Sequence, residues 1–230
     1  MTRRILTGCG CIDNHLNGGL DQESVTLIYG EAETGKSTMA MQCAVNCATQ
    51  GLKTLYVDCD GIFSAKRLSQ LAAEKFDEIA DLIVLVRPKD FREQTVVVDR
   101  LAEYTVKNSG LVVFDTVTSL YRVKVAESSG KAFGLNRELN RQVAIIAQTA
   151  RIKKIPMILV SQVRSSFNEI EGGVEPVGTR VLKFWADTII AMKPTESPQE
   201  VKALLEKPKR EREVTCNLRI DASGIHDYAF

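Results

Sequence analysis

With 230 residues, 44% of them hydrophobic, the chain is long enough to bury a full core in one large domain or two small ones. No apolar run reaches the length of a membrane-spanning helix, and the N-terminal MTRRILTG lacks the apolar segment of a secretory signal, so the sequence predicts a soluble, cytoplasmic protein. A formal net charge of +1 excludes strong overall attraction to nucleic acid, so any DNA contact must come from local basic patches.

Short apolar runs of strand length alternate with amphipathic segments of helix length along most of the chain. The expected strands cover residues 25–29, 53–58, 82–86, 111–114, 156–160 and 187–192. The expected helices include the segment AMQCAVNCA after the first strand and residues 65–76, 92–108 and 134–154. Strands this apolar are buried on both faces, and the alternation predicts an α/β domain with a mainly parallel central sheet flanked by helices. The charged, proline-containing segment after residue 192 is typical of an antiparallel hairpin at the sheet edge, and no second domain is required.

The six cysteines are compatible with a reducing, intracellular compartment. Three of them lie in apolar sequence, where a thiol behaves as a small hydrophobe: Cys43, Cys47 and Cys59. Cys9 and Cys11 form an isolated C-x-C, and the only histidines are His15 and His226. Because no second ligand pair accompanies the C-x-C, the sequence argues against a zinc site.

The segment GEAETGKST, residues 30–38, matches the phosphate-loop pattern G-x-x-x-x-G-K-[ST], with an expected strand before it and a helix after it. Its glycines let backbone amides turn toward one anion, and the helix N-terminus adds its dipole. Lys36 is expected to pair with the β- and γ-phosphates, and the Ser37 hydroxyl to ligate Mg²⁺. The alternative, a glycine turn that merely joins strand to helix, does not require the complete motif. The nucleotide contacts are assigned to Gly30, Glu31, Ala32, Glu33, Thr34, Gly35, Lys36, Ser37 and Thr38.

Two acidic strand ends complete the expected nucleotide site. The run LVVFD places Asp115 at the carboxyl edge of the sheet, where a carboxylate can hold magnesium through water. The run YVDCDG brings Asp58 and Asp60 near the nucleotide at the end of the strand that follows the phosphate-loop helix. We interpret Asp58 as a solvated strand-end acid, and Asp60 as the carboxylate that orients water for attack on the γ-phosphate.

Taken in order, GEAETGKS, YVDCDGIFSAKRL, LVVFDTVTSL and ILVSQVR resemble the RecA-type strand-exchange ATPases, and among them the archaeal recombinase paralogues. The likeness runs from about Thr7 to RIDASGIHD near the C-terminus and covers nearly the whole chain. It implies a single RecA-like P-loop ATPase core over residues 1–230 that binds ATP and Mg²⁺. In that family the acid at the position of Asp60 is usually a glutamate that acts as catalytic base, and Gln162 matches the glutamine that senses the γ-phosphate.

Two departures from the family pattern bear on mechanism. Aspartate at position 60 withdraws the carboxylate by one methylene, roughly 1 Å, and such a misplacement costs about 10²-fold in rate. About two dozen residues precede the first expected strand, and they contain neither a helical DNA-binding domain nor the Phe-x-x-Ala segment that docks on the next subunit. The resemblance therefore implies a monomer or dimer rather than a filament, with weak ATP hydrolysis that DNA hardly stimulates and no strand exchange of its own.

The same resemblance implies a place at the nucleoid, in recombination and DNA repair. It also implies partners: DNA bound independently of sequence, the main recombinase and a Holliday-junction resolvase. An accessory protein of this kind would regulate the recombinase or the cleavage of branched DNA.

DNA contact is expected from two loops that follow the Walker B and sensor strands of the recombinase fold. The first corresponds to residues 121–134, with the cations Arg122, Lys124 and Lys131. The second corresponds to residues 163–179, with Arg164 at its start and Arg180 just after it. Three acids in the second loop argue against tight phosphate contact there: Glu169, Glu171 and Glu175.

The densest basic cluster is KPKRER, residues 207–212, which contains Lys207, Lys209, Arg210 and Arg212. Such a cluster is expected to neutralise several phosphates and to make DNA binding salt-dependent. The alternative is a charged edge strand that protects the sheet from aggregation.

Three other functions remain open. A motor of the hexameric-helicase class predicts rapid, DNA-stimulated hydrolysis. A small-molecule kinase requires an arginine-bearing lid, which the sequence does not offer. A non-catalytic protein would use nucleotide only to fix a protein-binding surface.

Overall fold

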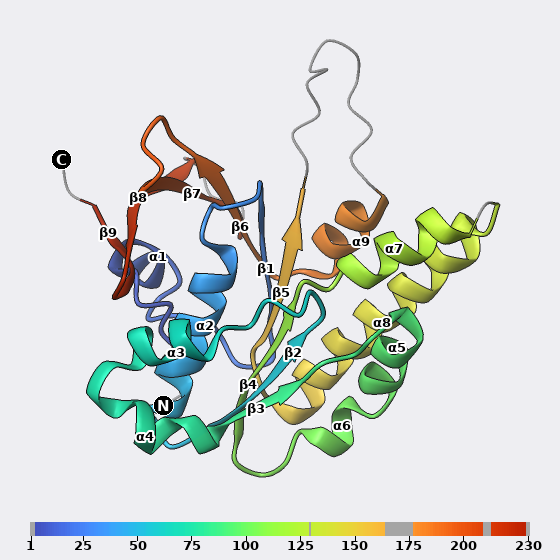
Figure 1. Cartoon of the computed structure of the whole chain (residues 1–230), viewed down its shortest axis with the longest axis horizontal. Coiled ribbons are helices and arrows are strands. Elements are labelled where there is room, and N and C mark those ends of the chain that lie inside the picture. The colour runs from blue at the N-terminus through green and yellow to red at the C-terminus, as the bar shows by residue number, and fades with distance from the viewer. Residues whose placement is uncertain (1–2, 129, 164–176, 209–212, 229–230) are drawn as a thin grey trace.

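The computed structural model describes residues 3–128, 130–163, 177–208 and 213–228 (Figure 1). In these residues nine strands form one sheet, in the order β3-β2-β4-β5-β1-β6-β7-β8-β9. The strands are β1 (Val25–Gly30), β2 (Lys53–Asp58), β3 (Ile83–Val86), β4 (Ser109–Asp115), β5 (Met157–Gln162), β6 (Thr188–Pro194), β7 (Glu200–Lys207), β8 (Val214–Asp221) and β9 (Gly224–Asp227). Strands β1 to β6 pair in parallel, and β7, β8 and β9 extend the sheet in antiparallel fashion. The predicted fold class is confirmed, including the C-terminal antiparallel strands.

Helices cover both faces of the sheet (Figure 1). One face carries α1 (Gly10–His15), α2 (Lys36–Ala48), α3 (Ala65–Ala72) and α4 (Phe76–Ile79), with the 3-10 turns Ala73–Lys75 and Ala80–Leu82. The other carries α5 (Phe91–Asp99), α6 (Leu101–Tyr104), α7 (Ser119–Glu127), α8 (Ala132–Lys153) and α9 (Val177–Trp185). Each face buries its own apolar cluster against the sheet, as expected for strands that are apolar on both sides. No helix of the described chain is long and apolar enough to span a bilayer.

Local signals account for where several helices begin and end. Ser64 and Asp90 accept hydrogen bonds from backbone amides in the first turns of α3 and α5, as N-cap residues do. The helix expected over residues 65–76 is interrupted at Ala73, whose φ of 48° leaves the helical region. The helix expected over 92–108 is likewise divided at Arg100.

The expectation of a loop at residues 121–134 is wrong, because α7 and the start of α8 occupy most of it. The reason lies in apolar side chains spaced for one helix face: Tyr121 is buried, and Val125 packs against the same core cluster four residues later. The ring of Tyr121 meets Phe91 of α5 edge-on, with centroids 5.8 Å apart. Burial of this face holds residues 121–127 in a helix, and Ser128 and Gly130 lie in the break between α7 and α8.

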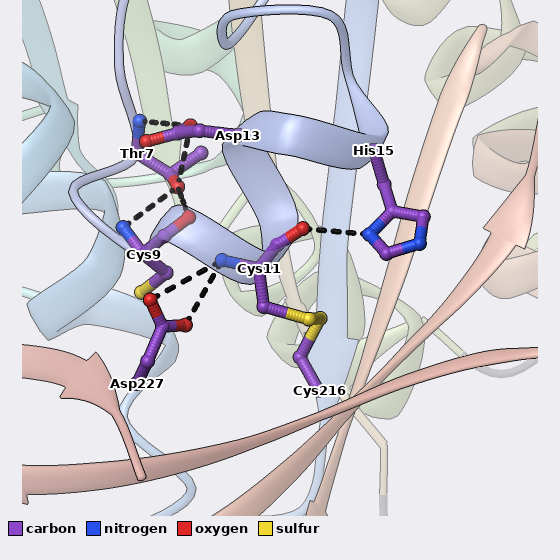
Figure 2. Close-up of a disulfide and its surroundings, with 7 residues drawn as sticks. All are labelled: Thr7, Cys9, Cys11, Asp13, His15, Cys216 and Asp227. Atoms are coloured by element: carbon purple, nitrogen blue, oxygen red, sulfur yellow. Dashed lines mark hydrogen bonds between the residues drawn. A yellow bond between two sulfur atoms is a disulfide. The ribbon is translucent and has the colours of Figure 1, made fainter. Parts of the chain in front are cut away.

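The N-terminal segment is fastened to the C-terminal strands (Figure 2). Cys11 of α1 and Cys216 of β8 form a disulfide across 205 residues of sequence. The remaining cysteines, Cys9, Cys43, Cys47 and Cys59, are buried free thiols. The C-x-C at residues 9–11 is therefore not isolated in space, since Cys11 has a second cysteine beside it.

Candidate nucleotide-binding site

The predicted site residues meet at the carboxyl edge of the parallel strands. In the sheet, Gly30 at the end of β1 is in register with Gln162 at the end of β5, and Asp58 is in register with Asp115. Above these ends lies a cavity of about 370 Å³, lined by Ala32, Glu33, Gly35, Lys36, Ser37, Thr38, Asp60, Ile62, Thr116, Gln162 and Ile220. One cleft thus contains most of the phosphate loop together with the predicted base and the predicted sensor.

The phosphate loop is held by close packing at Gly35 and by a hydrogen bond within the loop. Gly35 has a φ of +81°, and a Cβ there would approach Cδ1 of Ile220 to 2.6 Å and Cδ1 of Ile225 to 3.0 Å. Only glycine fits this backbone conformation and this close packing. The Thr34 hydroxyl donates a 2.9 Å hydrogen bond to the Glu31 carbonyl and closes the loop on itself. The contribution of Ile220 and Ile225 was not predicted, because these residues lie nearly 200 positions away in the chain.

Lys36 is buried, with 7% of its surface exposed. Its ammonium donates to the Glu31 carbonyl and, at 3.3 Å, to the Thr34 hydroxyl. Burial lowers the pKa of Lys36 to about 8, although the nearby carboxylates of Asp115, Glu31 and Asp60 oppose that shift. A cation that is this poorly solvated gains from an anionic ligand, and phosphate oxygens are such ligands.

Ser37 and Asp115 form an oxygen-lined pair suited to a hard cation. The Ser37 hydroxyl donates a 3.1 Å hydrogen bond to Oδ1 of Asp115, and the Tyr56 hydroxyl donates a 2.6 Å hydrogen bond to Oδ2. Burial raises the pKa of Asp115, so the carboxylate would gain from a nearby positive charge. Hydroxyl and carboxylate oxygens are the ligand types that Mg²⁺ takes, and the pair therefore fits the metal.

Tyr56 is a site residue that the sequence reasoning missed. It lies two positions before Asp58 in β2, so its side chain leaves the sheet on the same face as that of Asp58, next to the neighbouring strand β4. The signal was present: a tyrosine two positions before the acid that ends the strand. Its bond to Oδ2 fixes how the Asp115 carboxylate is turned.

Asp58 and Asp60 have different surroundings. The interpretation of Asp58 as solvated is wrong: its side chain is fully buried, pairs with Arg87 at 2.9 Å, and accepts hydrogen bonds from the amides of Ile62 and Phe63. It therefore shapes the turn that follows β2. Asp60 is exposed and lines the cavity, and its role as a base stays a prediction.

The predicted DNA contacts are only partly within the described residues. Lys124 lies on α7 and pairs with Glu127 at 3.3 Å, and Arg122 donates to the Gln162 carbonyl at 3.4 Å. Lys207 donates to the carbonyls of Lys183 and Ala186 at 2.8 and 3.1 Å, so two of the three donors of its ammonium stabilise the end of α9 rather than a DNA phosphate. Lys131 precedes the first turn of α8 and Arg180 lies on α9, and both are exposed. The other predicted contacts lie outside the described residues: Arg164, Lys209, Arg210 and Arg212.

Comparison with known proteins identifies the family. The model of the Rad51 family matches residues 2–228. The chain belongs to the Rad51 family. It is 31% identical over 93% of its length to "DNA repair and recombination protein RadB" of Methanococcus maripaludis, covering 96% of that relative. It is 37% identical to the protein of the same name from Methanobrevibacter smithii, over 82% of this chain and 80% of that one.

The fold of this Rad51-family chain also has a solved counterpart. "Crystal structure of the RadB recombinase" matches it with a TM-score of 0.80 and 29% identity, over 98% of this chain and all of that one. The resemblance to RecA-type ATPases, and within them to archaeal RadB, is confirmed.

Proposed function

We propose that the chain is an ATP-binding, DNA-binding accessory protein of homologous recombination and DNA repair. It binds ATP with Mg²⁺, hydrolyses it slowly and with little stimulation by DNA, and does not exchange strands by itself. The single observation that supports this most directly is the cleft that unites Lys36, Ser37, Asp60 and Gln162 in a chain of the Rad51 family. The printed names of its relatives supply the setting of DNA repair and recombination.

Five side chains in or beside the cleft have roles in this proposal. The amides of the phosphate loop and the Lys36 ammonium bind the phosphates of ATP, while Ser37 and Asp115 would hold Mg²⁺. The metal, when bound, neutralises charge that develops on the phosphates. Tyr56 keeps the Asp115 carboxylate turned toward Ser37. Asp60 orients and deprotonates the attacking water.

Slow hydrolysis follows from the length of the Asp60 side chain. In this family the corresponding residue is usually glutamate, and aspartate ends one methylene short of the water that it must orient. A displacement of this order costs about 10²-fold in rate. The backbone is not free to move Asp60 toward the water. The backbone amides of Cys59 and Asp60 both donate hydrogen bonds to the Asp115 carbonyl, at 2.7 and 3.4 Å.

Coupling to DNA has a short route in this fold. Gln162 lines the nucleotide cavity, and its carbonyl accepts from Arg122 of α7, a cation of the first predicted DNA-binding segment. The neighbouring amide of Val163 bonds to the carbonyl of Gly30 in the phosphate loop. Loss of the γ-phosphate would therefore act through Gln162 on Arg122 and alter the contact of Arg122 with a DNA phosphate. Association with the main recombinase and a resolvase is part of the proposal on family grounds.

The second candidate function is a DNA-stimulated motor of the RecA or hexameric-helicase class. The shared cleft is compatible with both functions, and the shortened side chain of Asp60 counts against the motor. A motor predicts that DNA accelerates hydrolysis strongly, whereas an accessory factor uses the bound nucleotide to set its affinity for DNA.

Nucleotide-dependent DNA binding tests the proposal. Fluorescence anisotropy of labelled single-stranded and branched DNA would be measured with ATP and Mg²⁺, with ADP, and without nucleotide. We expect ATP to change the affinity of the natural chain, the affinity to fall with salt, and Lys36→Met to show no response to ATP. Absence of DNA binding under all conditions, or identical binding with and without ATP, would overturn the proposal.

A further inference from the structure

Three side chains with metal-binding atoms converge where α1 meets β8 (Figure 2). Cys11 and His15 are four residues apart on α1 and therefore share one helix face, and Cys216 approaches them from β8. One ligand atom from each residue lies within 4.8 Å of the other two. The Cα atoms of the two cysteines are 5.9 Å apart. The three side chains are therefore close enough to share one ion once the S–S bond is reduced.

The chemistry of this set is selective. Two sulfurs and one imidazole nitrogen are the ligands of zinc and similar thiophilic cations, whereas Mg²⁺ requires oxygen. Nδ1 of His15 lies 2.7 Å from the Cys11 carbonyl oxygen, which only accepts hydrogen bonds. In the neutral ring, Nδ1 thus carries the proton and Nε2 carries the lone pair. Histidines that bind metals are held in the same way, with their other ring N–H donated to a carbonyl.

The surroundings hold the site in place and favour a cation. Both oxygens of Asp227 accept from the Cys11 amide, at 3.0 and 3.2 Å, which places a carboxylate beside the cysteines. The Asp13 carboxylate binds the amide and hydroxyl of Thr7, each at 2.8 Å, and fixes the approach to α1. Gln42 of α2 donates to the carbonyls of Thr7 and Ile225, and so ties the segment before α1 to β9. Cys216 is buried while Cys11 and His15 are partly exposed, so an ion has access from the side of α1.

We propose that Cys11, Cys216 and His15 form a Zn²⁺ site in the reduced chain, and that the disulfide is the oxidised, metal-free form of the same site. A dithiol reductant supplies two electrons and two protons, which break the S–S bond and leave two thiols. Binding of Zn²⁺ releases both protons, and the metal takes two thiolates and Nε2, with water in the fourth position. A low-molecular-weight disulfide reverses the first step and expels the ion.

Cobalt(II) absorption of the full chain tests the proposal. The chain would be reduced, the reductant would be removed under anaerobic conditions, and the reduced chain would be titrated with Co²⁺. The oxidised chain would be titrated in parallel. We expect the reduced chain to bind one Co²⁺ with thiolate-to-cobalt charge transfer and tetrahedral d–d bands, both removed by Zn²⁺, and the oxidised chain to show neither. Cobalt held by Ser37 and Asp115 gives no thiolate absorption, so the two sites are distinguishable. A reduced chain without charge-transfer absorption would overturn the proposal.

Matched variants identify the ligands. Cys11→Ser and Cys216→Ser are expected to abolish the absorption, and His15→Gln to weaken cobalt binding by about tenfold or more. The controls are Cys47→Ala, which removes a buried free thiol, and His226→Gln, which removes the other histidine. Unchanged cobalt affinity in His15→Gln, or an equal loss in the controls, would contradict the assignment. Zinc should also raise the melting temperature of the reduced natural chain and leave that of the oxidised chain unchanged.

Discussion

Replacing Lys36 by methionine is expected to remove ATP binding without destabilising the ATP-free protein. The ammonium is buried, and its pKa falls from 10.5 to about 8. A shift of this size corresponds to a penalty of about 3 kcal/mol on the charged form at neutral pH. Methionine keeps most of the apolar stem and carries no charge, although the bonds to Glu31 and Thr34 are lost. The ATP-free variant should thus be as stable as the natural chain, or more stable by at most about 3 kcal/mol.

The pH dependence has a definite sign. Because folding lowers the pKa of Lys36, the unfolded chain binds more protons between about pH 8 and 10.5. The stability of the natural chain relative to Lys36→Met therefore rises as the pH rises through that window. Below about pH 8 the cost of burying the charged Lys36 ammonium is fully present. Urea unfolding without nucleotide, at neutral pH and above the window, measures the stability difference between the natural chain and Lys36→Met and its change with pH. The reasoning fails if Lys36→Met is less stable by more than about 1 kcal/mol at neutral pH, or if ATP still stabilises it.

Three further substitutions probe separate parts of the account. Asp60→Glu restores the missing methylene and should raise steady-state ATP turnover, by up to about 10²-fold; equal rates would remove side-chain length as the cause of slow hydrolysis. Tyr56→Phe deletes the 2.6 Å hydrogen bond to buried Asp115, so it should cost about 1–3 kcal/mol in urea unfolding and shift the Mg²⁺ dependence of ATP binding to higher concentration. No change in either measurement would show that Tyr56 does not orient the carboxylate. Lys207→Ala loses two bonds to carbonyls at the end of α9 and should cost about 1.5–3 kcal/mol. The salt dependence of DNA binding should stay as it is; a flatter slope would return Lys207 to the DNA interface.

The parallel sheet and the phosphate loop could be predicted because their signals are local. Each buried strand is a short apolar run, and the loop motif lies between a strand and a helix within one stretch of sequence. Asp115 follows from the same logic, since the ends of parallel strands meet at one edge. The phosphate loop and Asp115 lie at the same edge of the sheet because their strands are parallel and in register. The alternation of strands and helices in the sequence already implies such a sheet.

What could not be predicted depends on contacts between distant segments. The role of Asp58 is set by Arg87, and that of Lys207 by the carbonyls that end α9, neither of which adjoins it in sequence. Cys11 seemed to lack a partner because Cys216 lies 205 residues away. The helix α7 was missed for a different reason: the loop at residues 121–134 was assigned by its position in the recombinase fold, and the apolar spacing of Tyr121 and Val125 was not considered.

Steady-state ATP hydrolysis with and without single-stranded DNA tests the central claim most directly, with Lys36→Met as the background. The account predicts turnover that is slow, above that of Lys36→Met, and nearly unchanged by DNA. Strong stimulation by DNA would contradict it, and would show that a chain with aspartate at position 60 works as a motor.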